Sequence, residues 1–112
     1  MVIEGDYDDQ NWYGAVRVDG RPITPTRSQA VMNHSPDGFA WGYGGSGPAQ
    51  LALALLLEAG LSDRAAIALH QRFKAQFIAR LPRGSFRLEV DVRAWAEENR
   101  KTTAMPTEES ER

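Results

Sequence analysis

Residues 42–47 come closest to a known chemical motif. Their sequence, Gly-Tyr-Gly-Gly-Ser-Gly, fits the G-x-G-x-x-G pattern, and a run rich in alanine and leucine follows it directly. N–H groups at the start of a helix can hold a phosphate group, so the candidate anion-binding residues are Gly44, Gly45, Ser46 and Gly47. The absence of a β-α-β pattern around the loop argues against a dinucleotide site. Walker A chemistry fails because Pro48-Ala49 stands where Lys and Ser or Thr are required.

Three aromatic residues overlap this loop and support a second hypothesis. Phe39, Trp41 and Tyr43 alternate with small residues, and Trp and Tyr are enriched at the centres of protein interfaces. A semi-exposed patch of these rings would anchor a protein partner. The structural alternative is that the glycines let the backbone pass closely beneath Trp41 and Tyr43 while the rings cap the core.

The polar residues beside the loop suggest no catalytic set. His34, Ser35 and Asp37 precede it and Ser46 lies within it, but residues so close in sequence rarely adopt triad geometry, and no G-x-S-x-G elbow is present. Residues 35–38, Ser-Pro-Asp-Gly, have the composition of a tight turn. His34 is therefore expected to be a hydrogen-bonding turn residue, and no catalytic residue is assigned.

The metal-ligating residues give equally little support for a metal site. The chain has two histidines and no cysteine, and His70 is expected to be a satisfied residue near the core. Asp6, Asp8 and Asp9 alternate like part of a calcium loop, but the glycine and the terminal glutamate of such a loop are missing. We expect no metal and no other cofactor.

Charge is unevenly distributed along the 112 residues, whose formal net charge is −2. Residues 1–11 carry four acids and no base, residues 12–95 ten bases against six acids, and residues 96–112 five acids against three bases. A sequence pI of about 5.6 argues against a nucleic-acid binder, for which values above about 9 are typical. Binding of nucleic acid through Arg64, Arg72, Arg80 and Arg83 therefore ranks last. The acidic ends instead suit a protein partner with a basic surface, and Asp6, Asp8 and Asp9 are candidate contacts.

The strand signals predict a short antiparallel sheet. Residues 12–18 read as a strand, and Asp19-Gly20 is a strong hairpin signal. Pro22 cannot donate to a ladder, so the return strand should be short or lie at an edge. Residues 30–33 are a candidate third strand, and the alternation over residues 86–92 predicts a half-buried strand.

Two central helices are predicted between these strands. Residues 49–58 should form a helix buried nearly all round, with Gly47 as its N-cap and Gly60 at its end. Ser62 can cap a second helix, whose apolar stripe is Ala66, Leu69, Phe73, Phe77 and Leu81. A short helix over 92–99 follows, with Asp91 as cap and Trp95 facing the core.

Together these elements predict an α+β domain over residues 12–100, with the two central helices packed on one face of the sheet and a short C-terminal helix. Residues 1–11 form an acidic segment that adds an edge strand or stays loose, and residues 101–112 form a disordered tail. The longest apolar run, residues 51–57, is far too short to cross a bilayer. With no cysteine and no secretory signal, a cytoplasmic location is expected and no membrane contact.

A family resemblance covers roughly residues 13–96. Residues 34–52, His-Ser-Pro-Asp-Gly-Phe-Ala-Trp-Gly-Tyr-Gly-Gly-Ser-Gly-Pro-Ala-Gln-Leu-Ala, resemble the signature of a family of small uncharacterised proteins found in bacteria, archaea, plasmids and phages. Phe73-Lys74 and the closing strand with its Trp-bearing segment are similar too. The resemblance implies no known reaction. Its mobile-element context resembles that of anti-defence proteins, including anti-CRISPR inhibitors.

These observations lead to two hypotheses from different classes. The first is a non-enzymatic protein-binding module from a mobile genetic element, acting as an inhibitor of a host defence complex. The alternative is a small nucleotide- or phosphate-binding module that uses the glycine-rich loop at the helix start.

Overall fold

A four-stranded antiparallel sheet forms one layer of the molecule, with strand order β3-β2-β1-β4. The structure, a computed structural model, describes residues 1–7 and 14–100. The strands are β1 (Val2–Tyr7), β2 (Gly14–Val18), β3 (Arg21–Ile23) and β4 (Phe86–Glu89). β1 pairs with β2 on one side and with β4 on the other, so that Ile3 lies opposite both Val18 and Leu88.

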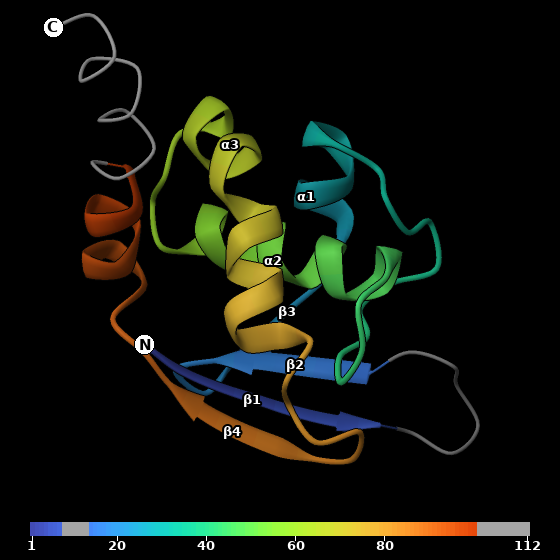
Figure 1. The fold of residues 1–112 in the computed structure, drawn as a ribbon. Helices are drawn as coiled ribbons and strands as arrows, with labels where there is room; N and C mark the ends of the chain where they lie inside the picture. Colours follow the sequence, from blue (N-terminus) through green and yellow to red (C-terminus); the bar gives the residue numbers. More distant parts are fainter. Residues whose placement is uncertain (8–13, 101–112) are drawn as a thin grey trace, which may run out of the picture.

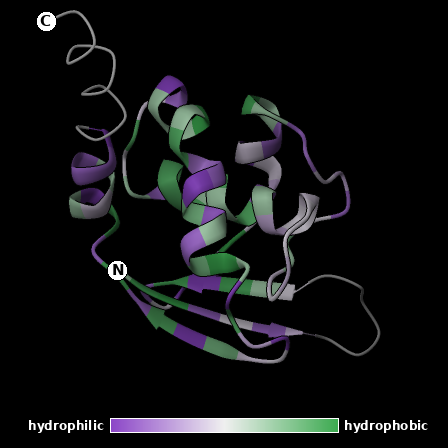
Figure 2. Cartoon of the chain, in the orientation of Figure 1, coloured by the Kyte–Doolittle hydropathy of each residue, from purple (hydrophilic) through white to green (hydrophobic). Residues whose placement is uncertain are grey.

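The two faces of the sheet differ in polarity because successive side chains of a strand point to opposite sides. The inward face carries buried residues: Ile3, Gly5, Val16, Val18 and Phe86. The outward face carries mainly charged residues: Glu4, Asp6, Arg17, Arg87 and Glu89. In Figure 1 the helices of the described chain lie on one side of the sheet only, and Figure 2 shows the alternation of polar and apolar residues along the strands.

The hairpin between β2 and β3 follows the sequence prediction. Asp19 and Gly20 have φ values of 50° and 82°, as a two-residue turn with a left-handed backbone requires. Pro22 lies in β3, which is three residues long and stands at the edge of the sheet. An edge strand tolerates proline because its outer N–H groups have no partner strand.

Helix α2 (Ser46–Glu58) is the centre of the core. Eleven of its thirteen residues, from Gly47 to Leu57, are buried, so the prediction of a helix surrounded on nearly all sides is confirmed. Gly60 ends it with a φ of 94°, and the Leu61 N–H donates to the Leu56 carbonyl at 3.2 Å. This hydrogen bond and the left-handed glycine are typical of a helix C-terminus.

The other helices cover α2. They are α1 (Thr26–Val31), α3 (Asp63–Phe73), the π-helix η1 (Lys74–Ile78) that continues α3, and a helix over residues 92–100. Ser62 caps α3 by accepting from the Ala65 N–H at 3.2 Å, and Asp91 accepts from the Ala94 N–H at 3.0 Å. Both predicted caps are confirmed. Trp95 packs against the core, as predicted, and meets Phe73 edge to face.

Several predicted elements need correction. Residues 30 and 31 lie in helix α1, not in a third strand, and residues 32 and 33 follow it without strand pairing. Strand β1 is neither loose nor at an edge: it lies between β2 and β4, so residues 2–7 belong to the folded domain. Helix α2 begins at Ser46 and its N-cap is Gly45, two residues before the predicted N-cap Gly47. Strand β4 ends at Glu89, and the π-helix was not anticipated.

Two predictions fall wholly or partly outside the described residues. The disordered tail over residues 101–112 lies outside them, as do residues 8–13, which include Asp8 and Asp9. Within the described ranges, no helix combines the length and apolarity needed to cross a membrane.

Candidate functional site

The indole of Trp41 occupies a slot that the sheet provides. A Cβ atom at Gly14 would lie 1.9 Å from Trp41, and one at Gly5 would lie 2.9 Å from it. Only glycine at these two strand positions leaves room for the ring. Trp41 is fully buried, its ring stacks on Tyr7 with centroids 4.2 Å apart, and it meets Phe86 edge to face.

Polar groups around Trp41 are paired inside the fold. The Trp41 N–H donates to the Tyr7 hydroxyl at 3.0 Å, and that hydroxyl donates to the Trp41 carbonyl at 3.2 Å. The indole N–H donates to the Gly84 carbonyl at 2.8 Å. Burial raises the pKa of the Tyr7 phenol, and the hydrogen bond that its oxygen accepts from the Trp41 backbone N–H opposes that rise. These contacts fasten the loop to the end of β1.

Two of the three rings of the predicted aromatic patch, Phe39 and Trp41, are buried. Phe39 is 2% exposed and Trp41 0% exposed, and the Phe39 carbonyl pairs with the Gly14 N–H. The prediction of a semi-exposed patch is therefore wrong for Phe39 and Trp41. The structural alternative holds for Trp41, although the glycines that make its slot lie in the strands and not in the loop.

Tyr43 differs from both in lying at the surface. It is 43% exposed and is the only exposed large hydrophobic residue within the described ranges. Its ring lies over the backbone of Gly45, where an added Cβ would be 2.7 Å from the ring. Next to it, Gly42 packs against the side chain of Arg83, and the Tyr7 phenol is influenced by the charges of both Tyr43 and Arg83.

Asp6 lies at the same end of the molecule as Tyr43. Its carboxylate accepts from the Ser85 hydroxyl at 2.7 Å and pairs with Arg17 at 3.1 Å. The Ser85 hydrogen bond and Arg17 hold the pKa of Asp6 below its usual value. The loop that holds Arg83 and Ser85 thus contacts Asp6 through Ser85 and Gly42 through Arg83, and we call Asp6, Tyr43, Arg83 and Ser85 together the Tyr43 surface.

The predicted anion-binding loop has a packing explanation for two of its four residues. Gly45 lies under the Tyr43 ring, and a Cβ at Gly47 would lie 2.7 Å from that of Ala40. Pro48, in the first turn of α2, has no N–H group to offer an anion. Gly44 and Ser46 are exposed. Anion binding by this loop stays a prediction.

A buried glutamine near the start of α2, Gln50, holds the loop that precedes this helix by hydrogen bonds. The Gln50 side-chain oxygen accepts from the backbone N–H groups of His34 at 2.7 Å and Ser35 at 2.9 Å. Its amide nitrogen donates to the Ser28 hydroxyl and to the Met32 carbonyl. Gln50 is 0% exposed, so all four hydrogen bonds form in the core.

This network brings His34 to His70. The two Nε2 atoms lie 2.8 Å apart, and His70 is 3% exposed while His34 is half-buried. The His70 Nδ1 atom lies 2.7 Å from the Ile67 carbonyl. Burial lowers the pKa of the His70 imidazole; the Ile67 hydrogen bond opposes that shift, and His34 adds to it. Both histidines have the hydrogen-bonded roles that the sequence predicted, but their pairing was not foreseen.

The candidate catalytic groups do not come together around His34. Its Nε2 atom faces His70, whereas Ser35 is buried and Ser46 is exposed at the start of α2. Within residues 1–7 and 14–100, no group of three or more His, Cys, Asp or Glu side chains is placed to hold a metal ion.

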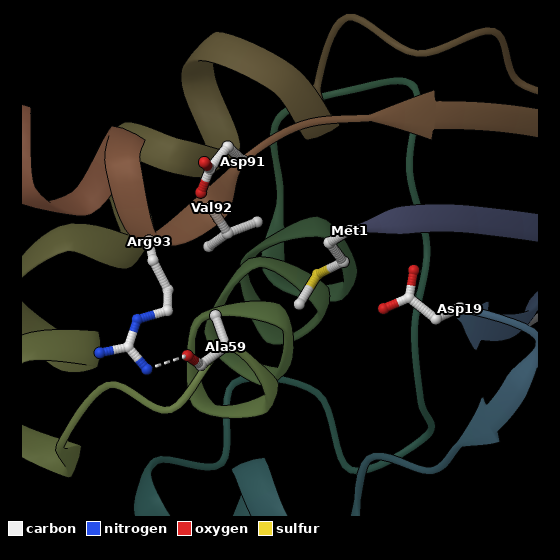
Figure 3. Close-up of a pocket in the computed structure, with 6 residues that line it drawn as sticks. All are labelled: Met1, Asp19, Ala59, Asp91, Val92 and Arg93. Carbon is white, nitrogen blue, oxygen red and sulfur yellow. Dashed lines mark hydrogen bonds between the residues drawn. The ribbon is translucent and has the colours of Figure 1, made fainter.

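A small cavity lies far from both regions, between the N-terminus of the chain and the end of α2 (Figure 3). Its volume is about 190 Å³, below the range of about 300–1,000 Å³ that is common for ligand pockets. Its polar groups are engaged within the fold: Asp19 accepts from the Val2 N–H, Asp91 caps the last helix, and Arg93 donates to the Ala59 carbonyl. These contacts give the cavity a structural role.

Sequence reasoning missed the role of Gln50, and it named Arg83 only as a candidate nucleic-acid contact. A lone glutamine within an otherwise apolar buried helix was the available signal for Gln50, since a buried amide needs partners for each donor and acceptor. No sequence signal connects Arg83 with Gly42, because their contact depends on where the chain returns after η1.

Comparison with known proteins places the chain in a family but assigns no activity. Searches of curated proteins and of solved structures found no match. A family model described as a family of unknown function, DUF6166, matches residues 5–98. This match spans most of the chain, including the last three residues of β1, the glycine-rich loop and both histidines. The chain therefore belongs to the DUF6166 family of unknown function.

Proposed function

We propose that this protein is a non-enzymatic protein-binding module that contacts its partner through the Tyr43 surface. The observation that carries the proposal is the 43% exposure of Tyr43 in a part of the chain where the neighbouring rings are buried. Tyrosine and arginine are enriched among the residues that dominate binding energy, and Arg83 packs against Gly42, the residue before Tyr43.

The rigid support beneath Tyr43 favours binding. Trp41, two residues away, is held by its strand slot and by hydrogen bonds to Tyr7 and Gly84. A side chain on such a support loses little conformational freedom when a partner covers it, and less free energy is then spent on ordering.

The proposed partner is a host defence complex encountered by a mobile element. This part of the proposal rests on the resemblance of residues 34–52 to a family found in plasmids and phages. The acidic charge of residues 1–11 favours a basic surface on that complex, such as one that binds nucleic acid. Of these acids, Asp6 borders the Tyr43 surface.

A site-specific crosslinking experiment tests the contact. A photoreactive phenylalanine analogue replaces Tyr43 in one variant and Arg64, an exposed residue near the start of α3, in the control. In host cells carrying a defence complex, we expect a stoichiometric adduct from position 43 and none from position 64. Failure of both positions to form an adduct, or equal yields from both, would overturn the proposal.

An interference assay then tests the consequence. Cells that express the wild-type chain should lose protection against an incoming plasmid or phage, and Tyr43→Ala should restore most of it. Truncation of a central interface tyrosine costs about 2 kcal/mol or more, which is roughly thirtyfold in affinity. Arg64→Ala should behave like the wild type. Full inhibition by Tyr43→Ala would exclude the Tyr43 surface as the contact.

A further inference from the structure

The two histidines of this chain meet through tertiary structure alone. They lie 36 residues apart in sequence, yet their Nε2 atoms are 2.8 Å apart. The ring centroids are 4.9 Å apart and the ring planes are inclined by 37°. Each Nε2 atom therefore points toward the same small region between the α1–α2 loop and α3.

The hydrogen bonds define which nitrogen carries a proton. A carbonyl oxygen only accepts, so the His70 Nδ1 atom, 2.7 Å from the Ile67 carbonyl, is the protonated nitrogen of a neutral ring. The His70 Nε2 atom then has a free lone pair and accepts from the His34 Nε2–H. A backbone carbonyl on the far nitrogen is also the arrangement that orients a metal-ligating histidine.

Contacts within the fold hold His34 and His70 in place. Gln50 fixes the backbone N–H groups of His34 and Ser35, and His70 is 97% buried on the rigid helix α3. The amide of Gln71 is 3.3 Å from the His70 Nε2 atom, and rotation of that amide would present its oxygen. Two imidazoles and one amide thus face one point from two elements of the fold.

We propose that His34 and His70 form a binding site for a borderline divalent metal ion such as Zn²⁺, with their Nε2 atoms as ligands. Imidazole nitrogen suits such ions. Nitrogens bound to a tetrahedral zinc ion lie about 3.3 Å from each other, so the pair must separate by about half an ångström and both rings must turn until their lone pairs point at the ion. The His34 proton moves from Nε2 to Nδ1, and water takes the remaining positions together with Gln71.

The expected site is open and exchangeable. Closed structural zinc sites use four protein ligands, whereas within the described residues this one has two imidazoles and the exposed Gln71 amide. His34 is half-buried, which gives the ion a route from solvent to the deeper His70. Binding therefore adds to a fold that already exists without the ion.

Titration of the full, untagged and EDTA-treated chain with Zn²⁺ tests the proposal. Because the chain has two histidines, its NMR spectrum has two imidazole Cε1–H signals. Both should shift together and stop shifting at one ion per chain. His34→Ala should weaken the calorimetric affinity at least tenfold, while Asp37→Asn, which removes an exposed carboxylate of the same loop, should leave it unchanged.

Three outcomes would overturn the proposal. Zn²⁺ leaves both imidazole signals in place, or shifts only one of them, or binds the wild type and His34→Ala with equal affinity. If His34→Ala does not fold, which near-UV circular dichroism would reveal, the two imidazole signals of the wild type still decide the question.

Discussion

The Tyr43 surface and the histidine pair both adjoin the start of α2, through Gly45 and Gln50 respectively, and they differ in which side chains are buried. Around Trp41, the fold buries the rings and satisfies the polar atoms internally, leaving Tyr43 as the exposed feature. Around Gln50, the fold buries a polar side chain and uses it to bring two imidazoles together. A motif that is conspicuous in sequence can thus be structural, while a pair that is inconspicuous in sequence can hold reactive atoms.

Among the variants that test this comparison, removal of the buried Trp41 ring should change the free energy of unfolding most. Trp41→Ala should lower the free energy of unfolding by about 3–5 kcal/mol, because a fully buried aromatic ring is lost and a cavity remains. Tyr43→Ala, two residues away but exposed, should change it by about 0.5 kcal/mol or less. Urea unfolding measures both. Equal losses from the two variants would mean that the aromatic residues of the loop share one role.

Removal of the buried Gln50 amide should cause the next largest decrease in the free energy of unfolding. Gln50→Leu keeps much of the side-chain volume but leaves two backbone N–H groups, a carbonyl and a hydroxyl without their partner. An unsatisfied buried group costs about 1–3 kcal/mol, so we expect a loss of about 2–4 kcal/mol in chemical denaturation. Ser28→Ala, which removes one of these partners, should cost about 1 kcal/mol. Wild-type stability of Gln50→Leu would show that the network is unimportant.

Two glycines of the loop offer a matched pair. Gly42 has a φ of 87°, and a Cβ there would lie 2.9 Å from the Arg83 side chain, whereas a Cβ at Gly44 would meet nothing within 4 Å. Gly42→Ala should therefore cost about 1–3 kcal/mol, and Gly44→Ala should be neutral within about 0.5 kcal/mol. Thermal unfolding distinguishes them. If Gly44→Ala is the more damaging variant, the loop depends on freedom at Gly44 and not on its contact with Arg83.

The smallest expected effect is a decrease in the free energy of unfolding at alkaline pH, caused by ionisation of Tyr7, which contacts Trp41. Burial raises the pKa of Tyr7 above its ordinary value of 10.0, so the folded chain retains the phenolic proton where the unfolded chain releases it. This contribution is complete below pH 10.0 and is lost as the pH rises through the folded-state pKa. Tyr7→Phe should be less stable at neutral pH but should lose less on going to alkali. The same alkaline slope of melting temperature in both proteins would exclude Tyr7 as its source.

Local patterns were sufficient where neighbours in sequence supply the interaction. The turn at Asp19-Gly20, the Ser62 and Asp91 caps and the left-handed Gly60 depend on residues within a few positions, and the structure confirms each of them. The burial of α2 could also be predicted because its leucines and alanines cover every face of the helix.

Distant pairing explains the predictions that were wrong. The acidic residues of β1 suggested an edge, but the outward face of a central strand can carry charge when its inward residues, here Ile3 and Gly5, are buried. Trp41 has the composition of an interface residue, and only the glycines of two strands determine that its ring lies inside. Residues 30 and 31 are helical although their local pattern permitted a strand.

The sequence by itself determined the α+β class, the caps and turns, and the leucine-rich helix at the centre, because these depend on short-range backbone preferences and on the periodicity of apolar residues. The tertiary structure alone decided that Trp41 is buried while Tyr43 is exposed, and that His34 meets His70. Those outcomes depend on contacts between segments far apart in the chain, where the space left by one side chain is set by residues that no local pattern relates to it.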